Sequence, residues 1–464
     1  MTRFTGSIAS LETAIKDLAT YVDSVKAPRA LHTLETELLA LAMRIALASL
    51  GQCISQGGTG HVGPVHTDAE GGERRLLDDA RPLVYRSLFG PLEILRAYYH
   101  DRELGGLHPL DAQVALPERS YSYHLQQAVA LLGTQNAYEE GEETLFDLLG
   151  IRIPKSMGEK LVADMASHVA AFREQLRPPA KEGPVTIVQA DAKGVNMVRP
   201  VEKAPPGPKL SFKPAERQGK KKMANAWTIY TATPDPGTPP VPLNRTTSAT
   251  MATKREAFTL MLLDLARRGP TAGVVLFLAD GDPVLDALQQ ELLPRAVSCL
   301  DWMHLQERVW EAAYVFHPKG SAEATIWVKK TNARLMNDDV ATVLRGLRQS
   351  LTKGQKRLSA GRKAALASVI GYMEANKHRM PYGTFMLKGY PIGTGSIEGG
   401  VRHLIGDRMD RTGMRWTEAG AQAMLDLRSI HVNGQVADFH AHRISREQER
   451  LYGANRPFQA DLCG

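Results

Sequence analysis

Residues 272–282 read AGVVLFLADGD, a continuous apolar run that stops at an acidic residue followed by glycine. A short unbroken apolar run that ends at turn residues predicts a β-strand covered on both faces. Ligands collect outside the carboxyl ends of strands in α/β sheets, so Asp280 is expected to face a site. A structural alternative stays open, because Asp before Gly is also an ordinary turn pair.

Strand-like and helical patterns alternate on both sides of this run. Strand-like segments are two short runs in 185–200, a third in 224–233 and a last one in 295–301, and helices are expected after Thr253 and over 283–293. The order is three strands, helix, strand, helix, strand. This order predicts an α/β layer structure around a mixed sheet.

The rest of the chain predicts further regions around this α/β unit. Residues 1–180 have mainly helical patterning with a short hairpin around 84–99, and the segment RPPAKEGP at 177–184 is typical of a linker. Helical patterning over 302–390 predicts an insertion between the first part of the unit, 181–301, and its last helices, 391–435. Residues 436–464, rich in Arg, His and Gln, are expected to be a peripheral tail.

The charge balance favours a polyanionic partner. Lys and Arg number 57 against 50 Asp and Glu, which gives a net charge of +7 over 464 residues. The segment KAPPGPKLSFKPAERQGKKK (203–222) has seven basic residues against Glu216 and lies between the second and third predicted strands. Lys220, Lys221 and Lys222 are candidates for phosphate contacts. A solvated, mobile loop is the alternative.

The cysteines and the apolar runs limit the class of protein. Cys53, Cys299 and Cys463 lie far apart in the sequence, so neither a disulfide nor structural zinc is expected. The N-terminus lacks the pattern of a signal peptide, and no stretch is expected to span a membrane. We therefore expect a cytoplasmic protein.

Two further acidic residues accompany Asp280. Asp191 lies near the end of the first predicted strand, and Glu398 lies in GTGSIEGGVRHLIGDRM (393–409), where Ser396 is expected to cap a helix. The predicted buried stripe of that helix is Ile397, Val401, Leu404, Ile405 and Met409. Each acid also has a structural explanation, a turn for the aspartates and helix-dipole or Arg402 pairing for the glutamate.

Three converging carboxylates would repel one another unless a cation neutralised them. All-oxygen ligands select hard ions such as Mg²⁺ or Mn²⁺. Two such ions can clamp a phosphodiester, one at the attacking oxygen and one at the leaving oxygen. The three acids therefore predict metal-dependent phosphoryl transfer.

These segments resemble bacterial insertion-sequence transposases with a ribonuclease-H-like core, of the Mutator-like kind that includes the ISKra group. The resemblance covers most of residues 80–435 and rests on four segments: VQADAKGV (188–195), FLADGDPVLDAL (277–288), CLDWMHLQERVWEAA (299–313) and the long block PIGTGSIEGGVRHLIGDRMDRTGMRWTEAGAQAMLDLRS (391–429). The last block is the most specific. The resemblance implies a mixed ribonuclease-H-like sheet interrupted by a helical insertion.

It also implies a DDE catalytic triad of Asp191, Asp280 and Glu398 that binds two Mg²⁺ or Mn²⁺ ions. Asp282 is a rival for the second acid, but Asp280 follows the apolar run directly and matches the family position. The family motif of Cys or Asp, two residues and His reads Asp301 to His304 here, so the resemblance gives His304 a role near the scissile phosphate. A packed or solvated histidine is the alternative.

Several segments are candidates for DNA binding. Arg408, Arg411, Arg415 and Trp416 follow the third acid and could hold phosphate and stack on a base, or form a charged surface with one packed tryptophan. Residues 139–165 contain a helix, Gly150 and a second helix, which resembles a helix-turn-helix but also fits a plain helical hairpin. Many relatives have a cysteine-rich zinc ribbon, and this chain has no cysteines in the corresponding region.

The resemblance implies a DNA transposase that hydrolyses phosphodiester bonds at the ends of an insertion sequence and joins the freed 3′-hydroxyls to target DNA. Its partners would be terminal-repeat DNA, target DNA and further copies of the chain, in the bacterial cytoplasm at the nucleoid and away from membranes. Two alternatives stay open: a catalytically silent DNA-binding protein derived from a transposase, and a ribonuclease-H-like nuclease that does not join DNA.

Overall fold

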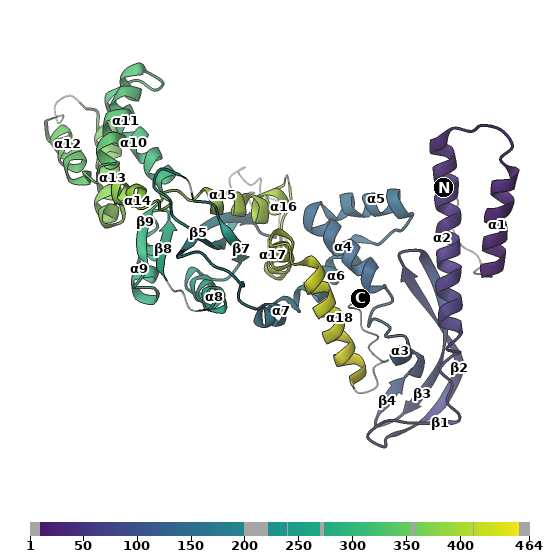
Figure 1. Ribbon diagram of the computed structural model, residues 1–464. Helices are drawn as coiled ribbons and strands as arrows, with labels where there is room; N and C mark the ends of the chain where they lie inside the picture. The colour runs from purple at the N-terminus through teal and green to yellow at the C-terminus, as the bar shows by residue number, and fades with distance from the viewer. Residues whose placement is uncertain are drawn as a thin grey trace, which may run out of the picture. The chain divides into compact units, whose positions relative to one another are not determined.

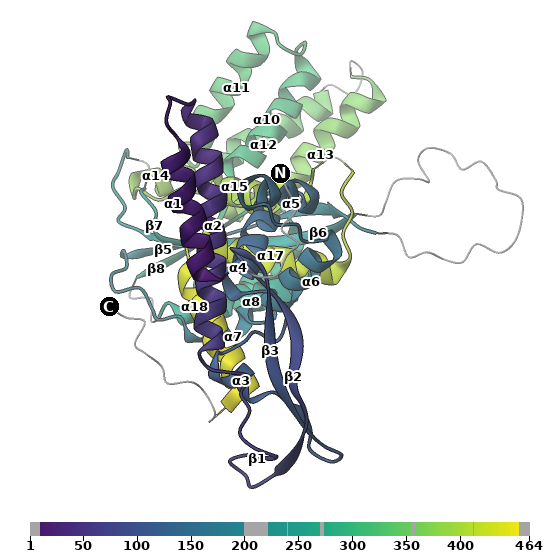
Figure 2. The same cartoon turned by 90° about the vertical axis from the view of Figure 1, so that its right-hand side faces the viewer.

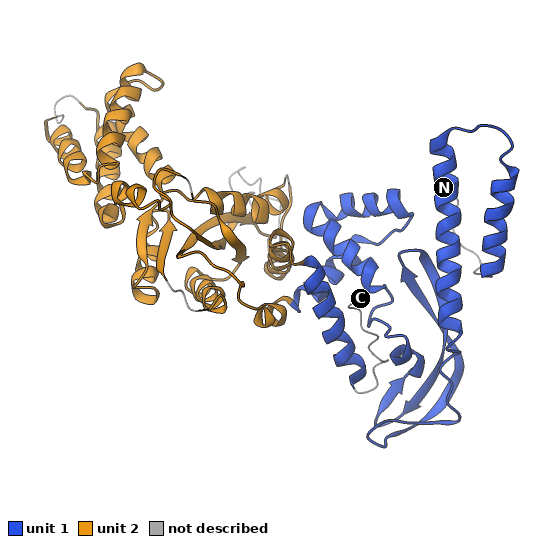
Figure 3. Ribbon diagram, in the orientation of Figure 1, with its two compact units in different colours: residues 1–168, 436–464 blue, residues 169–435 orange. Residues whose placement is uncertain are grey.

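The computed structural model describes residues 10–198, 221–238, 240–269, 273–353, 358–411 and 413–453. The chain forms two compact units (Figure 3). Unit 1 contains residues 1–168 and 436–464, and unit 2 contains residues 169–435. The first boundary therefore precedes the predicted linker, and the terminal segment returns to unit 1.

Unit 1 begins with two helices that lie side by side, α1 (Leu11–Ser24) and α2 (Leu31–Ser55) (Figure 2). Helix α2 is long and apolar enough to cross a membrane by length and composition, with a mean hydropathy of 1.6 over an 18-residue window. This finding corrects the expectation that no segment has this property. The part of α2 near its end packs against the apolar face of a sheet through Leu47, Leu50 and Ile54.

That sheet is antiparallel, in the order β1 (Val65–Thr67), β2 (Glu73–Ser87), β3 (Gly90–Asp101) and β4 (Gly105–Leu107). The predicted hairpin is confirmed, because Ser87 pairs with Gly90 at its turn. It is longer than predicted and carries a further strand on each side. The description of this region as mainly helical is therefore incomplete. The charges in β2 hide its periodicity, since only Ser87 of its 15 residues is buried.

Short helix α3 (Pro109–Gln113) precedes a cluster of three helices, α4 (Tyr123–Gln135), α5 (Tyr138–Leu149) and α6 (Lys155–Ala166). Gly150 ends α5 in the left-handed conformation with φ 69°, which a residue without Cβ adopts readily. The predicted helix, glycine and second helix are confirmed as structure, and α4 packs against both of the helices that follow it.

The expected C-terminal tail is instead largely a helix, α18 (Val436–Tyr452), packed into unit 1. Its buried side includes charged residues, Arg443 at 2% and Glu447 at 5% exposure. The Nη2 atom of Arg443 lies 3.1 Å from the Glu447 carboxylate and also donates to the Gln126 side chain. Because most of the buried residues of α18 are polar and only Phe439 is a large apolar one, apolar periodicity gave a weak signal for this helix.

Unit 2 is built around a mixed five-stranded sheet (Figure 1). Its order is β7 (Leu243–Thr250), β6 (Lys221–Ala232), β5 (Val185–Asn196), β8 (Val274–Ala279) and β9 (Val297–Leu300). Strands β5, β8 and β9 are parallel, whereas β6 is antiparallel to β5 and β7. The predicted α/β class with a mixed sheet is therefore confirmed.

The sequence of strands in this sheet differs from the prediction in two respects. Residues 185–196 form one continuous strand, and the third strand is β7, which the sequence did not indicate. Lys221 and Lys222, the last residues of the basic segment 203–222, begin the second strand, β6, and residues 203–220 lie outside the described residues. Strand β7 was missed because its buried residues are mostly polar: Thr247, Ser248 and Thr250 are at most 5% exposed, and Ala249 is the one apolar residue among them.

Helices cover both faces of the sheet. Helices α8 (Lys254–Arg267) and α9 (Pro283–Leu292) pack on the face that includes Val188 and Phe277. The opposite face, with Ile187 and Leu276, shares its core with the helical insertion. The predicted insertion is confirmed as α10 (Trp302–Phe316), α11 (Ala322–Leu335), α12 (Val340–Lys353), α13 (Ala360–Asn376), η3 (Lys377–Arg379) and α14 (Tyr382–Leu387).

The chain then returns to the sheet through α15 (Gly395–Val401), a π-helical turn η4 (Arg402–Gly406), α16 (Asp407–Met409) and α17 (Glu418–Val432). Helix α15 contacts β5 and β6, and α17 contacts β7 and the short helix α7 (Val169–Gln175). The five predicted stripe residues from Ile397 to Met409 are all buried. The third predicted acid is thereby carried to the central strand.

Candidate active site

Two of the three predicted acids lie where the parallel pairing of β5 and β8 ends, Asp191 within β5 and Asp280 directly after β8. Ala190 of β5 pairs with Ala279 of β8, so Asp191 and Asp280 follow paired positions at the carboxyl edge of the sheet. Both line a cavity of about 130 Å³ whose walls include Trp227 and Phe258. The strand register therefore brings these two carboxylates to one place.

Asp282, the rival for the second acid, has a structural role. Its Oδ1 atom caps α9 by accepting hydrogen bonds from the backbone N–H groups of Val284 and Leu285, at 2.8 and 3.2 Å. Its other oxygen pairs with Lys254. Burial raises the pKa of Asp282, but the bonds from Lys254 and the two amides outweigh burial and lower it. Asp282 is already occupied, whereas among the described residues the Asp280 carboxylate accepts one hydrogen bond, from the backbone N–H of Asp282 at 3.1 Å.

Gln189 attaches the third acid's helix to the same strand. Its side chain is fully buried, its Oε1 atom accepts a hydrogen bond from the Ile397 N–H at 3.0 Å, and its Nε2 atom donates to the Gly393 carbonyl at 3.2 Å. Glu398 follows Ile397 directly and is exposed. Gln189 is two residues before Asp191 on β5, and it thus holds the start of α15 against that strand.

The glycines around Glu398 have different environments. A Cβ atom on Gly400 would lie 3.0 Å from the Thr247 side chain and 3.2 Å from that of Thr228, so this glycine permits close packing on the sheet. A Cβ atom on Gly395 or Gly399 would meet nothing within 4 Å. Helix α15 begins at Gly395 with Thr394 at its N-cap position, which corrects the predicted cap at Ser396.

The acids influence one another electrostatically. Burial raises the pKa of Asp191, and the negative charges of Asp280 and Glu398 raise it further, against a hydrogen bond from the Ala192 N–H and the positive charge of His304. Among the described residues, none forms an ion pair with Asp191, Asp280 or Glu398. The site therefore holds uncompensated negative charge.

A buried aspartate holds His304 beside these acids. Asp301 is fully buried at the N-cap of α10, and its Oδ2 atom accepts hydrogen bonds from the backbone N–H and ring Nδ1 of His304, at 2.9 and 2.7 Å. Its Oδ1 atom accepts the Thr394 N–H at 2.7 Å, which joins α10 to the chain before α15. The hydrogen bond to Asp301 is the main reason that the pKa of His304 rises to about 9, and the charges of Asp280 and Asp191 add to it. His304 is therefore charged at neutral pH.

The donor set at this edge fits a hard divalent cation. It consists of three carboxylates without ion-pair partners, and oxygen ligands of this kind bind Mg²⁺ or Mn²⁺. Within the ranges that the structure describes, no three His, Cys, Asp or Glu side chains are close enough to form a ready ligand group. The structure thus brings the three acids into electrostatic range without arranging them as a preformed metal cage.

Some of the predicted DNA-contacting residues are buried and others are exposed. Arg408 is 1% and Trp416 8% exposed, and the guanidinium of Arg408 lies 4.9 Å from the centre of the Trp416 ring. These two side chains pack together and do not present a stacking surface in the described conformation. This agrees with the alternative interpretation, in which the tryptophan is packed. Arg415 and Lys221 are exposed, and Arg411 is half-buried. Lys222 is half-buried and pairs with Glu418, while Lys220 lies outside the described residues.

Sequence reasoning missed three buried polar residues that hold the site. Gln189 had a weak signal, since a polar residue stands in an apolar strand at an even spacing from Asp191. Asp301 was recognised only as part of the histidine motif, although an Asp before a helix predicts a cap. Arg379 had no signal, because it lies in a basic helical stretch whose arginines are otherwise expected at the surface.

The chain matches no model of a known protein family, and no curated protein matches it. Among solved structures it is similar to a chain of the Drosophila P element transposase strand transfer complex. The identity is 10% and the TM-score 0.22, over 75% of this chain and 86% of that chain. At these values the similarity assigns neither a fold nor a function.

Proposed function

We propose that this protein is a DDE transposase that cuts and joins DNA at Asp191, Asp280 and Glu398. The observation that carries the proposal is that the first two acids follow paired positions of neighbouring strands, and that Gln189 fixes the helix of the third to the same strand. The sequence resemblance to Mutator-like insertion-sequence transposases, strongest over 391–429, adds the reaction type.

The three carboxylates would hold two Mg²⁺ or Mn²⁺ ions. Bound there, divalent ions supply the positive charge that a phosphodiester needs for attack by water or a 3′-hydroxyl and for departure of the leaving oxygen. The protein's part is to hold its oxygen ligands on rigid elements, Asp191 within β5, Asp280 directly after β8 and Glu398 on α15. Precise placement of this kind lowers the entropic barrier of the reaction.

His304 has a supporting role in this proposal. Its Nδ1 atom is engaged by Asp301, and a charged imidazole carries a second proton on Nε2. That proton would be donated to a phosphate oxygen near the scissile bond. The charge persists at neutral pH because the pKa is about 9.

DNA would be held by the helix pair α5–α6 and by exposed basic residues near the site. Helix α6 exposes Lys155 and Lys160, and Arg415 and Lys221 are exposed in unit 2. Phosphate contacts of this kind bind any sequence and weaken as salt rises. DNA-end recognition by α5–α6, self-association to pair two ends and a location at the bacterial nucleoid are parts of the same proposal.

The test uses the purified full-length chain, Mg²⁺, a target plasmid and labelled DNA that spans the gene with its natural flanks. We expect joined products, detected by sequencing of the junctions, that disappear in Asp191→Ala, Asp280→Ala and Glu398→Ala. The matched control is Glu323→Ala, an exposed acid in the first turn of α11, which keeps wild-type joining.

Two results would replace this proposal by its alternatives. Cleavage that depends on Asp191 but never yields joined DNA would identify a nuclease. DNA binding with neither cleavage nor joining would identify a silent DNA-binding protein. Joining that survives in Asp191→Ala would remove the proposed site.

A further inference from the structure

The helical insertion contributes a fully buried arginine to the edge of the sheet. Arg379 is the last residue of η3 and is 0% exposed. A buried guanidinium is costly unless its charge is paired and its donors are bonded. The residues around Arg379 must therefore pair with its charge and accept its hydrogen bonds.

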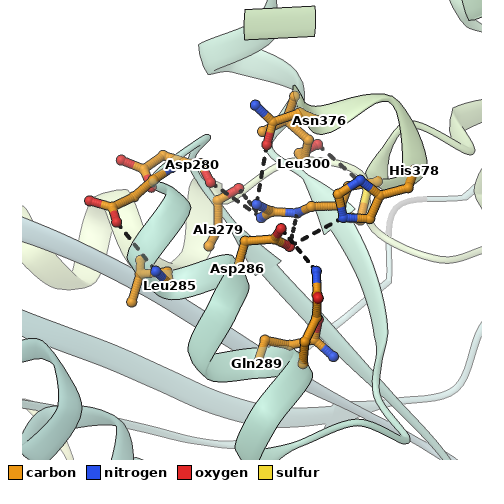
Figure 4. A network of polar contacts seen from close by, with 12 residues as sticks. Ala279, Asp280, Leu285, Asp286, Gln289, Leu300, Asn376 and His378 are labelled. Atoms are coloured by element: carbon orange, nitrogen blue, oxygen red, sulfur yellow. Dashed lines mark hydrogen bonds and ion pairs between the residues drawn. The ribbon is translucent and has the colours of Figure 1, made fainter. Parts of the chain in front are cut away.

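The partners of Arg379 belong mainly to the segment that carries the second acid. Its Nη2 atom donates to the backbone carbonyls of Ala279 and Asp280, at 3.3 and 3.2 Å. Its Nη1 atom donates to the side-chain oxygen of Asn376 at 3.4 Å, and its Nε atom lies 3.6 Å from the Asp286 carboxylate. In Figure 4 the polar groups of Ala279, Asp280, Asp286 and Asn376 lie close together in one network of contacts.

Asp286 extends the contact to the helix that follows Asp280. It lies in the first turn of α9, and its carboxylate also contacts His378 at 3.3 Å and accepts a hydrogen bond from Gln290 at 3.1 Å. One guanidinium thus joins the end of β8, the start of α9 and the end of α13.

A second residue of the insertion supports the same turn. A Cβ atom on Gly281 would lie 2.3 Å from the ring of Tyr372 on α13, so only glycine allows this close approach. Arg379 binds the carbonyl groups before and at Asp280, and Tyr372 covers the residue after it. The backbone of Asp280 is consequently held by the insertion on both sides.

We propose that Arg379 is a positioning residue that directs the Asp280 carboxylate toward Asp191, and that divalent-cation binding at these acids depends on it. The proposal rests on the proposed function only in taking these acids as the cation site. The planar guanidinium can reach two carbonyls and a carboxylate together, whereas a lysine ammonium is a single point charge. The insertion is then a structural part of the site and not only an addition to it.

The test measures Mn²⁺ binding to the full-length protein by electron paramagnetic resonance of the free ion. Residues that orient metal ligands typically change affinity by about 10–100-fold when removed. We expect Arg379→Met to weaken Mn²⁺ binding by at least about tenfold and Arg379→Lys to fall between it and wild type. Arg334→Met, the same change at an exposed position of α11, keeps wild-type affinity. Tryptophan fluorescence checks that each variant is folded.

A double variant separates positioning from the cost of a stranded charge. Arg379→Met alone leaves Asp286 without its buried partner, so Arg379→Met with Asp286→Asn removes both charges. We expect the double variant to regain stability but still to bind Mn²⁺ weakly. Wild-type Mn²⁺ affinity in the double variant, or in folded Arg379→Met, would overturn the positioning role.

The outcome is independent of transposition. If wild type binds Mn²⁺, loses it in Asp191→Ala and in Arg379→Met, and yet joins no DNA, the proposed function fails and the role of Arg379 stands. If wild type joins DNA and Arg379→Met binds Mn²⁺ normally, the role of Arg379 fails and the proposed function stands.

Discussion

The two β-sheets of this protein differ in how they are covered. In unit 2, adjacent residues of one strand are both buried, as Ile187 and Val188 in β5 and Leu276 and Phe277 in β8 are, all at 0% exposure. Side chains alternate between faces, so both faces of this sheet are covered. In unit 1, strand β2 has one buried residue, and Val84 is 49% exposed.

The carboxylates near the two sheets also differ, in whether they form ion pairs. In unit 1, Asp68 pairs with Arg74 at 2.7 Å and Asp111 with Arg96 at 2.6 Å. In unit 2, Asp191 and Asp280 lie at a covered sheet edge, and neither forms an ion pair with a described residue. Acids that serve the fold are neutralised locally, whereas acids left unpaired at a buried edge store a charge that a ligand can satisfy.

Buried charge alone does not identify a site. Arg443 and Glu447 are buried in unit 1 and pair with each other at 3.1 Å. The distinguishing property of unit 2 is that its buried polar residues hold unpaired acids or the elements that carry them. Four paired substitutions test this comparison.

The largest expected effect is on the cores. Phe277→Ala in β8 should lower the free energy of unfolding of unit 2 by about 3–5 kcal/mol, because it empties a site between two packed layers. Val84→Ala in β2 should change stability by no more than about 0.5 kcal/mol. All five tryptophans lie in unit 2, so their fluorescence in urea reports that unit, and hydrogen exchange over 73–101 reports β2 and β3. Similar losses at both positions would contradict the difference in coverage.

Two buried glutamines give the next comparison. Gln189→Leu leaves the Ile397 N–H and the Gly393 carbonyl unpaired and should cost about 1–3 kcal/mol. It should also weaken Mn²⁺ binding, because α15 is no longer fixed on β5. Gln126→Leu in unit 1 removes a partner of Arg443 and of the Tyr121 carbonyl. Gln126→Leu should destabilise unit 1 and keep wild-type Mn²⁺ affinity. If both variants weakened Mn²⁺ binding equally, the comparison would fail.

Replacement by asparagine should change stability in opposite directions at Asp191 and at Asp68. The pKa of Asp191 is raised by burial and neighbouring acids, so its ionised form opposes folding above that pKa. Asp191→Asn should therefore stabilise unit 2 at pH 7 while joining is lost, and the gain should shrink as pH falls through the raised pKa. The pKa of Asp68 is lowered by its bond to Arg74. Asp68→Asn should destabilise unit 1 at pH 7, with the loss vanishing in acid. Urea unfolding at several pH values measures both.

The smallest expected effect is the pH dependence due to His304. Its pKa is about 9 in the folded protein against 6.5 for an ordinary histidine, so its stabilising contribution is complete below pH 6.5 and is lost as pH rises through 9. His304→Gln should thus differ from wild type in stability at pH 6 and approach it at pH 10. His61 is the exposed histidine for comparison in unit 1, where it lies 3.7 Å from Asp79. His61→Gln should leave the stability of unit 1 close to that of wild type, as is usual for an exposed position. A difference for His304→Gln that does not change with pH would argue against the charged pair with Asp301.

Much of unit 2 could be predicted because its signals are local. The apolar run ending at Asp280, the buried stripe around Glu398 and the helical periodicity of 302–390 each lie within one segment. The strand β7 and the helix α18 could not be predicted in this way. Their buried faces carry Thr, Ser, Arg and Glu, and these residues are stable inside only with partners far along the chain, such as Asn433 for Thr247.

The sequence alone determined the fold class and the helical insertion and predicted the three candidate acids, because hydrophobic periodicity and turn residues act over a few positions. Only the tertiary structure decided that Ala190 pairs with Ala279, that Gln189 holds α15 and that Arg379 reaches Asp280. These contacts join residues about a hundred or more positions apart. Strand register and the partners of buried polar groups depend on the assembled core, which no local pattern encodes.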